Sequence, residues 1–184
     1  AVQGDYSLQI FENSIAHHVD NLYYSKVSDI EKRERIQWFN KFAAEILAVS
    51  PDMMWFLPSR ARFIPYVCNG LLDLIPDYPE QFPNKLRICH APTDRLGKGT
   101  PYIEEAILQL QNEGYCLEFN ILENLKHSQV IEEIRKCDLF IDQIHHGWYG
   151  GVAVEAMALG KVVMGYIRSK DLIHVPQEMA DEIT

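Results

Sequence analysis

The sequence lacks the patterns that identify several classes of protein, and each absence excludes one of them. It has no Cys-x-x-Cys pair, so neither a zinc site nor a thioredoxin-like redox motif is indicated. No apolar run approaches the roughly 18 residues of a membrane-spanning helix, and the first residues carry no basic segment followed by an apolar one. Cationic residues are also scarce, with 17 Lys and Arg against 26 Asp and Glu and a net charge of −9. Nucleic acid is therefore not an expected partner, and we expect a soluble, cytoplasmic protein in a reducing compartment.

The composition is that of a globular protein, with 47% hydrophobic and 23% charged residues. A length of 184 residues fits one domain and a piece of another. Asn69-Gly70 and three prolines between residues 76 and 83 interrupt the chain, which predicts a linker over residues 69–84. The sequence thus divides into residues 1–68, this linker, and residues 85–184.

The segment before the linker predicts a helix, a short helix and a strand. Ser28 and Glu31 form a capping-box pattern at a helix start. Apolar residues then recur at three- and four-residue intervals and predict a buried stripe, formed by Ile36, Phe39, Phe42, Ala43, Ile46 and Leu47. The opposite, solvated face is predicted from Lys32, Arg33, Glu34 and Lys41. Pro51 can begin a short helix, and residues 62–67 resemble a strand.

After the linker the pattern becomes regular. Apolar runs at residues 86–90, 117–122, 138–144 and 161–167 alternate with helix-like segments. The runs are apolar on both faces, as buried parallel strands are. This βαβ alternation predicts an α/β fold, a Rossmann-like parallel sheet sandwiched by helices.

Two loops of this predicted sheet carry residues suited to binding an anionic ligand. Ligands of open α/β sheets bind beyond the carboxyl ends of the strands, where residues 90–100 and 143–151 fall. Gly150 and Gly151 open a helix whose first-turn N–H groups suit a phosphate. Glu155 follows one turn later, at a spacing that lets a carboxylate bind a ribose diol. Lys98, in the other loop, would neutralise a diphosphate.

Each of these features also has a structural explanation. A glycine pair before a helix is common in α/β proteins, and a lone lysine such as Lys98 is often a solvated surface charge. Tyr149 and Trp148 can simply fill the interior of their loop. Adjacent histidines, as at His145-His146, point to opposite sides of an extended segment. A metal site is therefore not expected.

Together the two loops resemble the C-terminal domain of retaining GT-B glycosyltransferases, in particular glycosyltransferase family four. Residues 147–163, G-W-Y-G-G-V-A-V-E-A-M-A-L-G-K-V-V, are similar to the family signature E-G-F-G-L-x-x-x-E-A-M-A-x-G-x-P-V-I. Lys98-Gly99 resembles the end of its G-R-x-x-x-x-K-G motif. The stretch from Ile64 to Gly70 looks like the family's I-P-N-G-V-D linker.

The resemblance implies a role for each matching residue. Glu155 is then the second glutamate of the E-x7-E motif and binds the ribose, and Lys98 contacts the diphosphate and acts in catalysis. The remaining residues implied at the cofactor-binding or catalytic site are Gly150, Gly151 and Val152 through their amides, Tyr149 in the same loop, and Arg95 as counterpart of the family arginine. No metal or other cofactor is required.

The chain departs from the family in two ways. Gly147 stands where the family has its first glutamate, and Asp142, Gln143 or His145 are candidates to replace it. The length is about half of a two-domain enzyme, so residues 1–68 are expected to be the end of an acceptor-side domain and residues 85–184 a nucleotide-sugar-binding domain that lacks its last helices.

The resemblance predicts a cytoplasmic glycosyltransferase, or part of one, in polysaccharide biosynthesis. It would bind a nucleotide-diphosphate sugar and transfer the sugar with retention to an unknown acceptor: a glycan, a lipid-linked sugar or a small molecule. Peripheral membrane association through further regions is compatible with this role. A non-catalytic nucleotide-binding or assembly module of the same fold is the alternative, and a sugar-nucleotide epimerase is a third.

Overall fold

The structure is a computed structural model that describes residues 26–183 except residues 69, 79, 80 and 82. Contacts divide the described residues into two compact units, which we call the sheet unit (residues 67–144 and 149–166) and the flanking unit (residues 26–66, 145–148 and 167–183). Residues 167–183 thus pack with the N-terminal part of the chain, whereas the sequence division placed them with residues 85–166. The domain limits at residues 68 and 84 stay a prediction.

The sheet unit is an α/β sandwich around one four-stranded parallel sheet. Its strands lie in the order β4-β3-β5-β6 and comprise β3 (Leu86–His90), β4 (Leu117–Ile121), β5 (Leu139–Ile141) and β6 (Val162–Met164). All four fall within the predicted apolar runs, and the Rossmann-like parallel sheet is confirmed. β5 and β6 are shorter than predicted, although the Asp142 N–H still donates to the Met164 carbonyl and the Tyr166 N–H to the Gln143 carbonyl, each at 2.8 Å.

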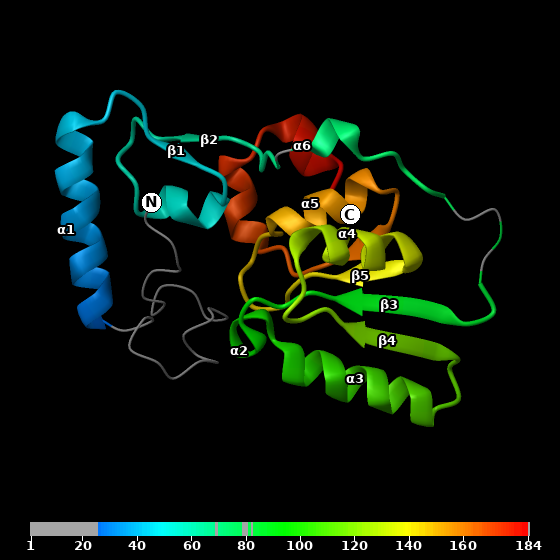
Figure 1. The fold of residues 1–184 in the computed structure, drawn as a ribbon. Coiled ribbons are helices and arrows are strands. Elements are labelled where there is room, and N and C mark those ends of the chain that lie inside the picture. Colours follow the sequence, from blue (N-terminus) through cyan, green and yellow to red (C-terminus); the bar gives the residue numbers. More distant parts are fainter. Residues whose placement is uncertain (1–25, 69, 79–80, 82, 184) are drawn as a thin grey trace. The chain divides into compact units, whose positions relative to one another are not determined.

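Helices cover both faces of this sheet. The helical elements of the sheet unit are η5 (Leu71–Asp73), α2 (Arg95–Lys98), α3 (Thr100–Asn112), α4 (His127–Lys136) and α5 (Gly151–Ala158). Figure 1 shows α3 on one face and α4 with α5 on the other. The two faces have separate apolar clusters, one containing Ile103 and Ile107 of α3 and the other Ile134 of α4 and Ala156 of α5.

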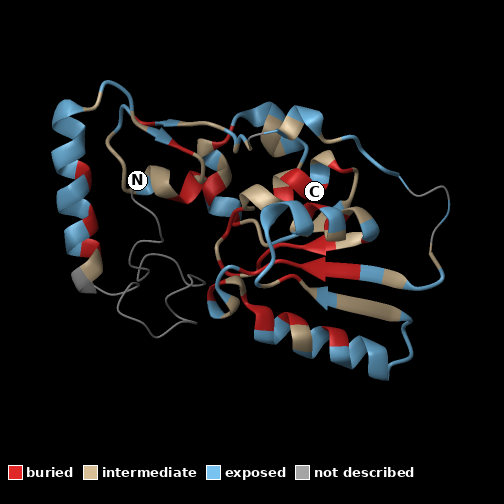
Figure 2. Ribbon diagram, viewed as in Figure 1, coloured by how far each residue is buried: buried red, intermediate tan, exposed pale blue. Residues whose placement is uncertain are grey.

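The central strands bury side chains on both faces. Ile88 and Ile141 pack in the cluster under α3, while their neighbours Cys89 and Phe140 pack under α4 and α5. Figure 2 accordingly shows the carboxyl half of β3 and most of β5 as buried, whereas β4 at the edge is more exposed. This alternation explains why apolar residues occupy both faces of the central strands.

An ion pair fixes the pairing of β3 with β5 at their amino ends. The Arg87 guanidinium donates to both carboxylate oxygens of Asp138, at 2.7 and 3.0 Å, and the Arg87 backbone N–H donates at 2.8 Å. These hydrogen bonds lower the pKa of Asp138. The opposite, carboxyl ends of β3 and β5 are free to carry the loops of the candidate site.

The strand order places a topological switch point between β3 and β5. From β3 the chain crosses to β4 on one side, and the later strands β5 and β6 lie on the other side. Loops leaving the carboxyl ends of β3 and β5 therefore diverge, and such a point is where open α/β sheets bind ligands.

The flanking unit contains short elements held by side-chain contacts. They are α1 (Lys26–Phe42), β1 (Leu47–Ala48), η4 (Pro51–Trp55), β2 (Arg62–Phe63), η6 (Ser169–His174) and α6 (Gln177–Asp181), with β1 and β2 paired in parallel. Trp55 donates to the Asp171 carboxylate at 2.9 Å and stacks edge-on against His174 at 4.7 Å between ring centroids. These contacts join η6 to η4 and explain why the C-terminal residues belong to this unit.

The helix predicted to begin at Ser28 has different bounds. It starts by Lys26, so the predicted capping box of Ser28 and Glu31 is wrong, and it ends at Phe42. The Arg60 guanidinium donates to the carbonyl groups of Asn40, Ala43 and Ala44, which satisfies the last turn. Leu47 then lies in β1, because strand pairing with β2 replaces helical hydrogen bonds.

The buried face of α1 also differs from the predicted stripe. Asp29, Lys32 and Ile36 are buried, whereas Phe39 and Phe42 are 45% and 71% exposed. The exposed rings pack on Trp38, at 5.1 Å between centroids in both cases. Aromatic contacts along the helix surface therefore replace the predicted core contact. Although α1 has 17 residues, no helix in the described ranges is both long and apolar enough to cross a membrane.

Phe140 gives a direct test of the sheet packing. Its side chain is 0% exposed at the centre of the cluster under α4 and α5. We expect Phe140→Ala to lower the free energy of unfolding by about 3–5 kcal/mol, because it removes apolar contacts and leaves a cavity. Urea denaturation followed by circular dichroism measures the change.

The matched control is Leu108→Ala on α3, where the side chain is 58% exposed. That variant should stay within about 0.5 kcal/mol of wild type. Equal losses in the two variants would contradict the assignment of Phe140 to the core.

Candidate functional site

Lys98 reaches the switch point through a short helix with a defined start. The Asp94 carboxylate accepts hydrogen bonds from the N–H groups of Leu96 and Gly97, each at 3.1 Å, and so caps α2. The Lys98 N–H then bonds to the Asp94 carbonyl at 2.9 Å. The single turn of α2, which follows β3, thus fixes the backbone of Lys98.

The Lys98 side chain forms an ion pair across the switch point. Its Nζ lies 2.5 Å from Oδ1 of Asp142, the residue that follows β5. The side chain of Asp142 is 1% exposed and that of Lys98 is 15% exposed. In addition, the Ile144 N–H donates to the Lys98 carbonyl at 3.3 Å. The loop after β5 is therefore bound to both the backbone and the side chain of Lys98.

Gly150 completes this arrangement at the start of α5. Its N–H donates to the second oxygen of Asp142, Oδ2, at 2.6 Å. A Cβ at position 150 would lie 3.4 Å from Lys98 Nζ and 3.6 Å from each Asp142 oxygen, which are ordinary van der Waals contacts. We call Lys98, Asp142 and Gly150 the Asp142 clamp.

Glu155 lies one turn into α5 and is held by a histidine from the neighbouring helix. Its Oε1 is 2.8 Å from Nε2 of His127, the first residue of α4. The side chain of Glu155 is 7% exposed, whereas that of His127 is 65% exposed. Since a carboxylate only accepts, Nε2 of His127 carries the proton. No local sequence pattern links these two residues, and the sequence alone missed His127.

The other predicted residues of this loop lie at the start of α5. Gly151 and Val152 form its first turn, where N–H groups have no intrahelical acceptor. The Gly151 carbonyl accepts from the Cys68 thiol at 3.4 Å. Val152 and Tyr149 pack against the cluster under α4 and α5, and burial raises the pKa of Tyr149. Tyr149 thus makes the packing contacts of its structural explanation, and its role in binding a nucleotide stays a prediction.

Arg95 is not brought to the Asp142 clamp. Its guanidinium donates to Glu123 at 2.9 Å and to Glu104 at 2.7 Å. The hydrogen bond to Glu104 and the bond to Glu123 raise the pKa of Arg95. Two carboxylates thus neutralise the second cation that the sequence offered for a diphosphate.

A buried histidine links the strands beneath these loops. His90, the last residue of β3, is 0% exposed. Its Nδ1 lies 2.8 Å from the Ile141 carbonyl and its Nε2 2.8 Å from the Thr100 hydroxyl. Because the carbonyl can only accept, Nδ1 carries the proton and Nε2 accepts from Thr100. This contact joins β3, β5 and the start of α3, and sequence reasoning missed it because its partners are 10 and 51 residues away.

The position of the family's first glutamate is occupied by a constrained glycine in the flanking unit. Gly147 has a φ of 76°, and a Cβ there would lie 3.0 Å from Cβ and Cζ of Arg168. Any side chain at this position is strained. Of the three candidate replacements, Gln143 donates to the Tyr166 carbonyl, His145 belongs to the flanking unit, and Asp142 contacts Lys98.

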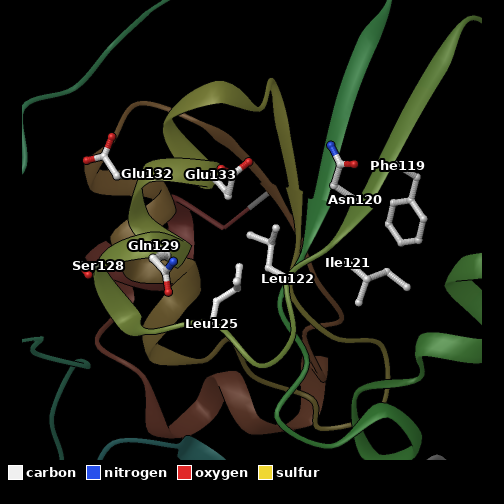
Figure 3. A pocket seen from close by; sticks show the side chains of 9 residues that line it. All are labelled: Phe119, Asn120, Ile121, Leu122, Leu125, Ser128, Gln129, Glu132 and Glu133. Carbon is white, nitrogen blue, oxygen red and sulfur yellow. The ribbon is translucent and has the colours of Figure 1, made fainter.

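A surface pocket of about 560 Å³ lies elsewhere on the sheet unit. Figure 3 shows Leu122 and Leu125 on the α4 side of β4 and Phe119 and Ile121 on its other side. The remaining lining residues are polar: Asn120, Ser128, Gln129, Glu132 and Glu133. None of the predicted site residues lines this pocket. Within the described ranges, no three His, Cys, Asp or Glu side chains are placed to hold a metal ion.

A double-mutant cycle tests the Asp142 clamp. Lys98→Met leaves a buried carboxylate without its cation, and we expect it to lower the free energy of unfolding by about 3–5 kcal/mol. Asp142→Asn should also destabilise, and the two losses should be non-additive by roughly 1–3 kcal/mol. Urea denaturation of the four proteins gives the coupling energy. The exposed pair of Lys85 and Glu118 is the control and should show no resolvable coupling; additive losses at Lys98 and Asp142 would refute the clamp.

The buried His90 predicts how stability depends on pH. Burial lowers its pKa in the folded protein, so the unfolded chain, with an ordinary pKa of about 6.5, takes up the proton first. The free energy of unfolding should therefore fall as the pH drops below about 6.5. His90→Gln should be less stable at neutral pH but show a shallower decline between about pH 6.5 and 5. Parallel curves for the two proteins would show that His90 does not carry this dependence.

Comparisons with known proteins add no assignment to this geometry. No protein-family model matches the chain, and no curated protein shows significant similarity to it. The resemblance to glycosyltransferase family four therefore rests on the motif residues alone.

Proposed function

We propose that this chain is the donor-binding region of a glycosyltransferase that uses a nucleotide-diphosphate sugar. The proposal places the nucleotide at the carboxyl ends of β3 and β5. One observation carries it: the loop with Lys98 and the loop entering α5 converge at the topological switch point and contact each other through the Asp142 clamp. In this fold class ligands bind at that place.

Glu155 is the residue that we propose for the ribose. A buried carboxylate one turn into a helix can accept from two vicinal hydroxyl groups, because its two oxygens offer about four lone pairs. His127 uses one of them. The exposed imidazole beside Glu155 supports access from solvent on the α4 side.

The first turn of α5 and Lys98 are the groups that we propose for the diphosphate. Gly151 and Val152 bring N–H groups and the positive end of the helix dipole. When the bond between the sugar and the diphosphate breaks, the leaving group gains negative charge, which Lys98 would stabilise. Retention, independence from metal ions and the unknown acceptor follow the family resemblance.

The charge balance of the clamp limits how strongly a diphosphate can bind. Asp142 already neutralises Lys98 and accepts from Gly150, and Arg95 is paired with Glu104 and Glu123. A diphosphate would share Lys98 with a buried carboxylate. We therefore expect the amides of α5 and Glu155 to contribute more of the affinity than the cations.

This same observation favours the alternative function. A protein that keeps the fold but neutralises its own cations is suited to a non-catalytic nucleotide-binding or assembly module. The glycine at position 147 in place of a glutamate, where any side chain would be strained, agrees with that alternative, since donor-sugar contacts would be lost first. Sugar transfer or donor hydrolysis, assayed with the nucleotide sugar that matches the best-bound base, separates the two functions.

Calorimetric titration with UDP, GDP and ADP tests the proposal. We expect at least one to bind, and Glu155→Ala to weaken that affinity by about 1.5–3 kcal/mol because a charge-assisted contact to the diol is lost. The nucleotide affinity of Glu155→Gln, which keeps the shape of the side chain, should lie between those of wild type and Glu155→Ala.

Glu132→Ala, on the exposed part of α4, is the control and should bind like wild type. Denaturation curves show whether each variant is folded. If no nucleotide binds to the wild-type chain, or if both Glu155 variants bind normally, the proposed site is wrong.

A further inference from the structure

A side chain from a different helix holds the Glu155 carboxylate in place. This contact bears on how the proposed site would recognise a ribose. We infer that His127 is a positioning residue for ribose recognition: it orients the Glu155 carboxylate toward the ribose diol. The inference rests on the proposed function, because it concerns the ligand that Glu155 would bind.

The backbone of His127 is held at a defined place. Gln129 Oε1 accepts from the Lys126 N–H at 3.0 Å, which fixes the start of α4 directly before His127. α4 packs on α5 through the buried residues of their shared cluster, among them Ile131 and Ala153. The distance of 2.8 Å between His127 Nε2 and Glu155 Oε1 is therefore set by helix packing.

A single hydrogen bond is enough to restrict the carboxylate. A glutamate side chain has three rotatable bonds, and ordering it upon binding costs conformational entropy. With Oε1 bound to His127, the plane of the carboxylate is restricted before any ligand arrives. Oε2 and the second lone pair of Oε1 retain acceptor capacity for two hydroxyl groups.

The two cations of the loop after β3 are engaged elsewhere. Lys98 binds Asp142, and Arg95 binds Glu104 and Glu123. The hydrogen bond from His127 Nε2 orients the Glu155 carboxylate. Loss of the imidazole should thus act on the diol contact and leave the phosphate contacts intact.

The experiment compares ribose and deoxyribose ligands. Calorimetry measures the Kd of wild type, His127→Ala and His127→Gln for the best-bound of UDP, GDP and ADP, for its 2′-deoxy counterpart, and for inorganic pyrophosphate. Wild type should prefer the ribonucleotide roughly tenfold or more. His127→Ala should lose about five- to tenfold of ribonucleotide affinity and most of that preference, while pyrophosphate affinity stays unchanged.

His127→Gln should recover part of the preference, since its amide can donate to Glu155. Ser128→Ala, at the adjacent exposed position, is the control and should match wild type. An equal loss for all three ligands, or an unchanged preference for ribose in His127→Ala, overturns the positioning role. If wild type binds none of the nucleotides, the proposed function fails and the inference with it, so the two failures are distinguishable.

Discussion

The candidate site depends on one buried carboxylate. Asp142 is 1% exposed, and an ionised carboxylate at such a place is stable only when it is paired and hydrogen-bonded. Lys98 and the Gly150 N–H supply these partners. Loss of Lys98 would leave the Asp142 charge uncompensated, and loss of the Gly150 N–H would remove a hydrogen bond to it. The end of α2, the loop after β5 and the entrance of α5 are therefore joined through Asp142.

This constraint also sets what the site can do. The carboxylate occupies the kind of position that a helix N-terminus offers to an anion, so it lowers the gain from binding a second anion there. In the proposed complex, recognition would then shift along α5 toward Glu155, where a ribose offers neutral hydroxyl groups. A nucleotide would be selected more by its ribose and by backbone amides than by net charge, which agrees with a protein that carries a net charge of −9.

The sequence was sufficient to predict the sheet, because a strand that is buried on both faces is visible as a continuous apolar run. Ile88 and Cys89 serve opposite faces, and such apolar pairs recur in each central strand. It was insufficient for the partners of the site residues: Asp142 is 44 residues from Lys98 and His127 is 28 from Glu155. In α1, Phe39 and Phe42 recur with the period of a buried stripe, but packing buries another face of the helix. Periodicity predicts that one side is buried; only packing decides which.

The motif that suggests a glycosyltransferase is divided between the two compact units. Residues 149–163 belong to the sheet unit with Glu155, whereas Gly147 and Trp148 belong to the flanking unit. The positive φ of Gly147 and its proximity to Arg168 disfavour any side chain where the family has a glutamate. Under the proposed function, nucleotide binding and contact with the donor sugar would therefore be subject to different structural constraints. A chain could retain nucleotide binding while its contacts with the donor sugar change. For this reason affinity for a nucleotide and transfer of a sugar have to be measured separately.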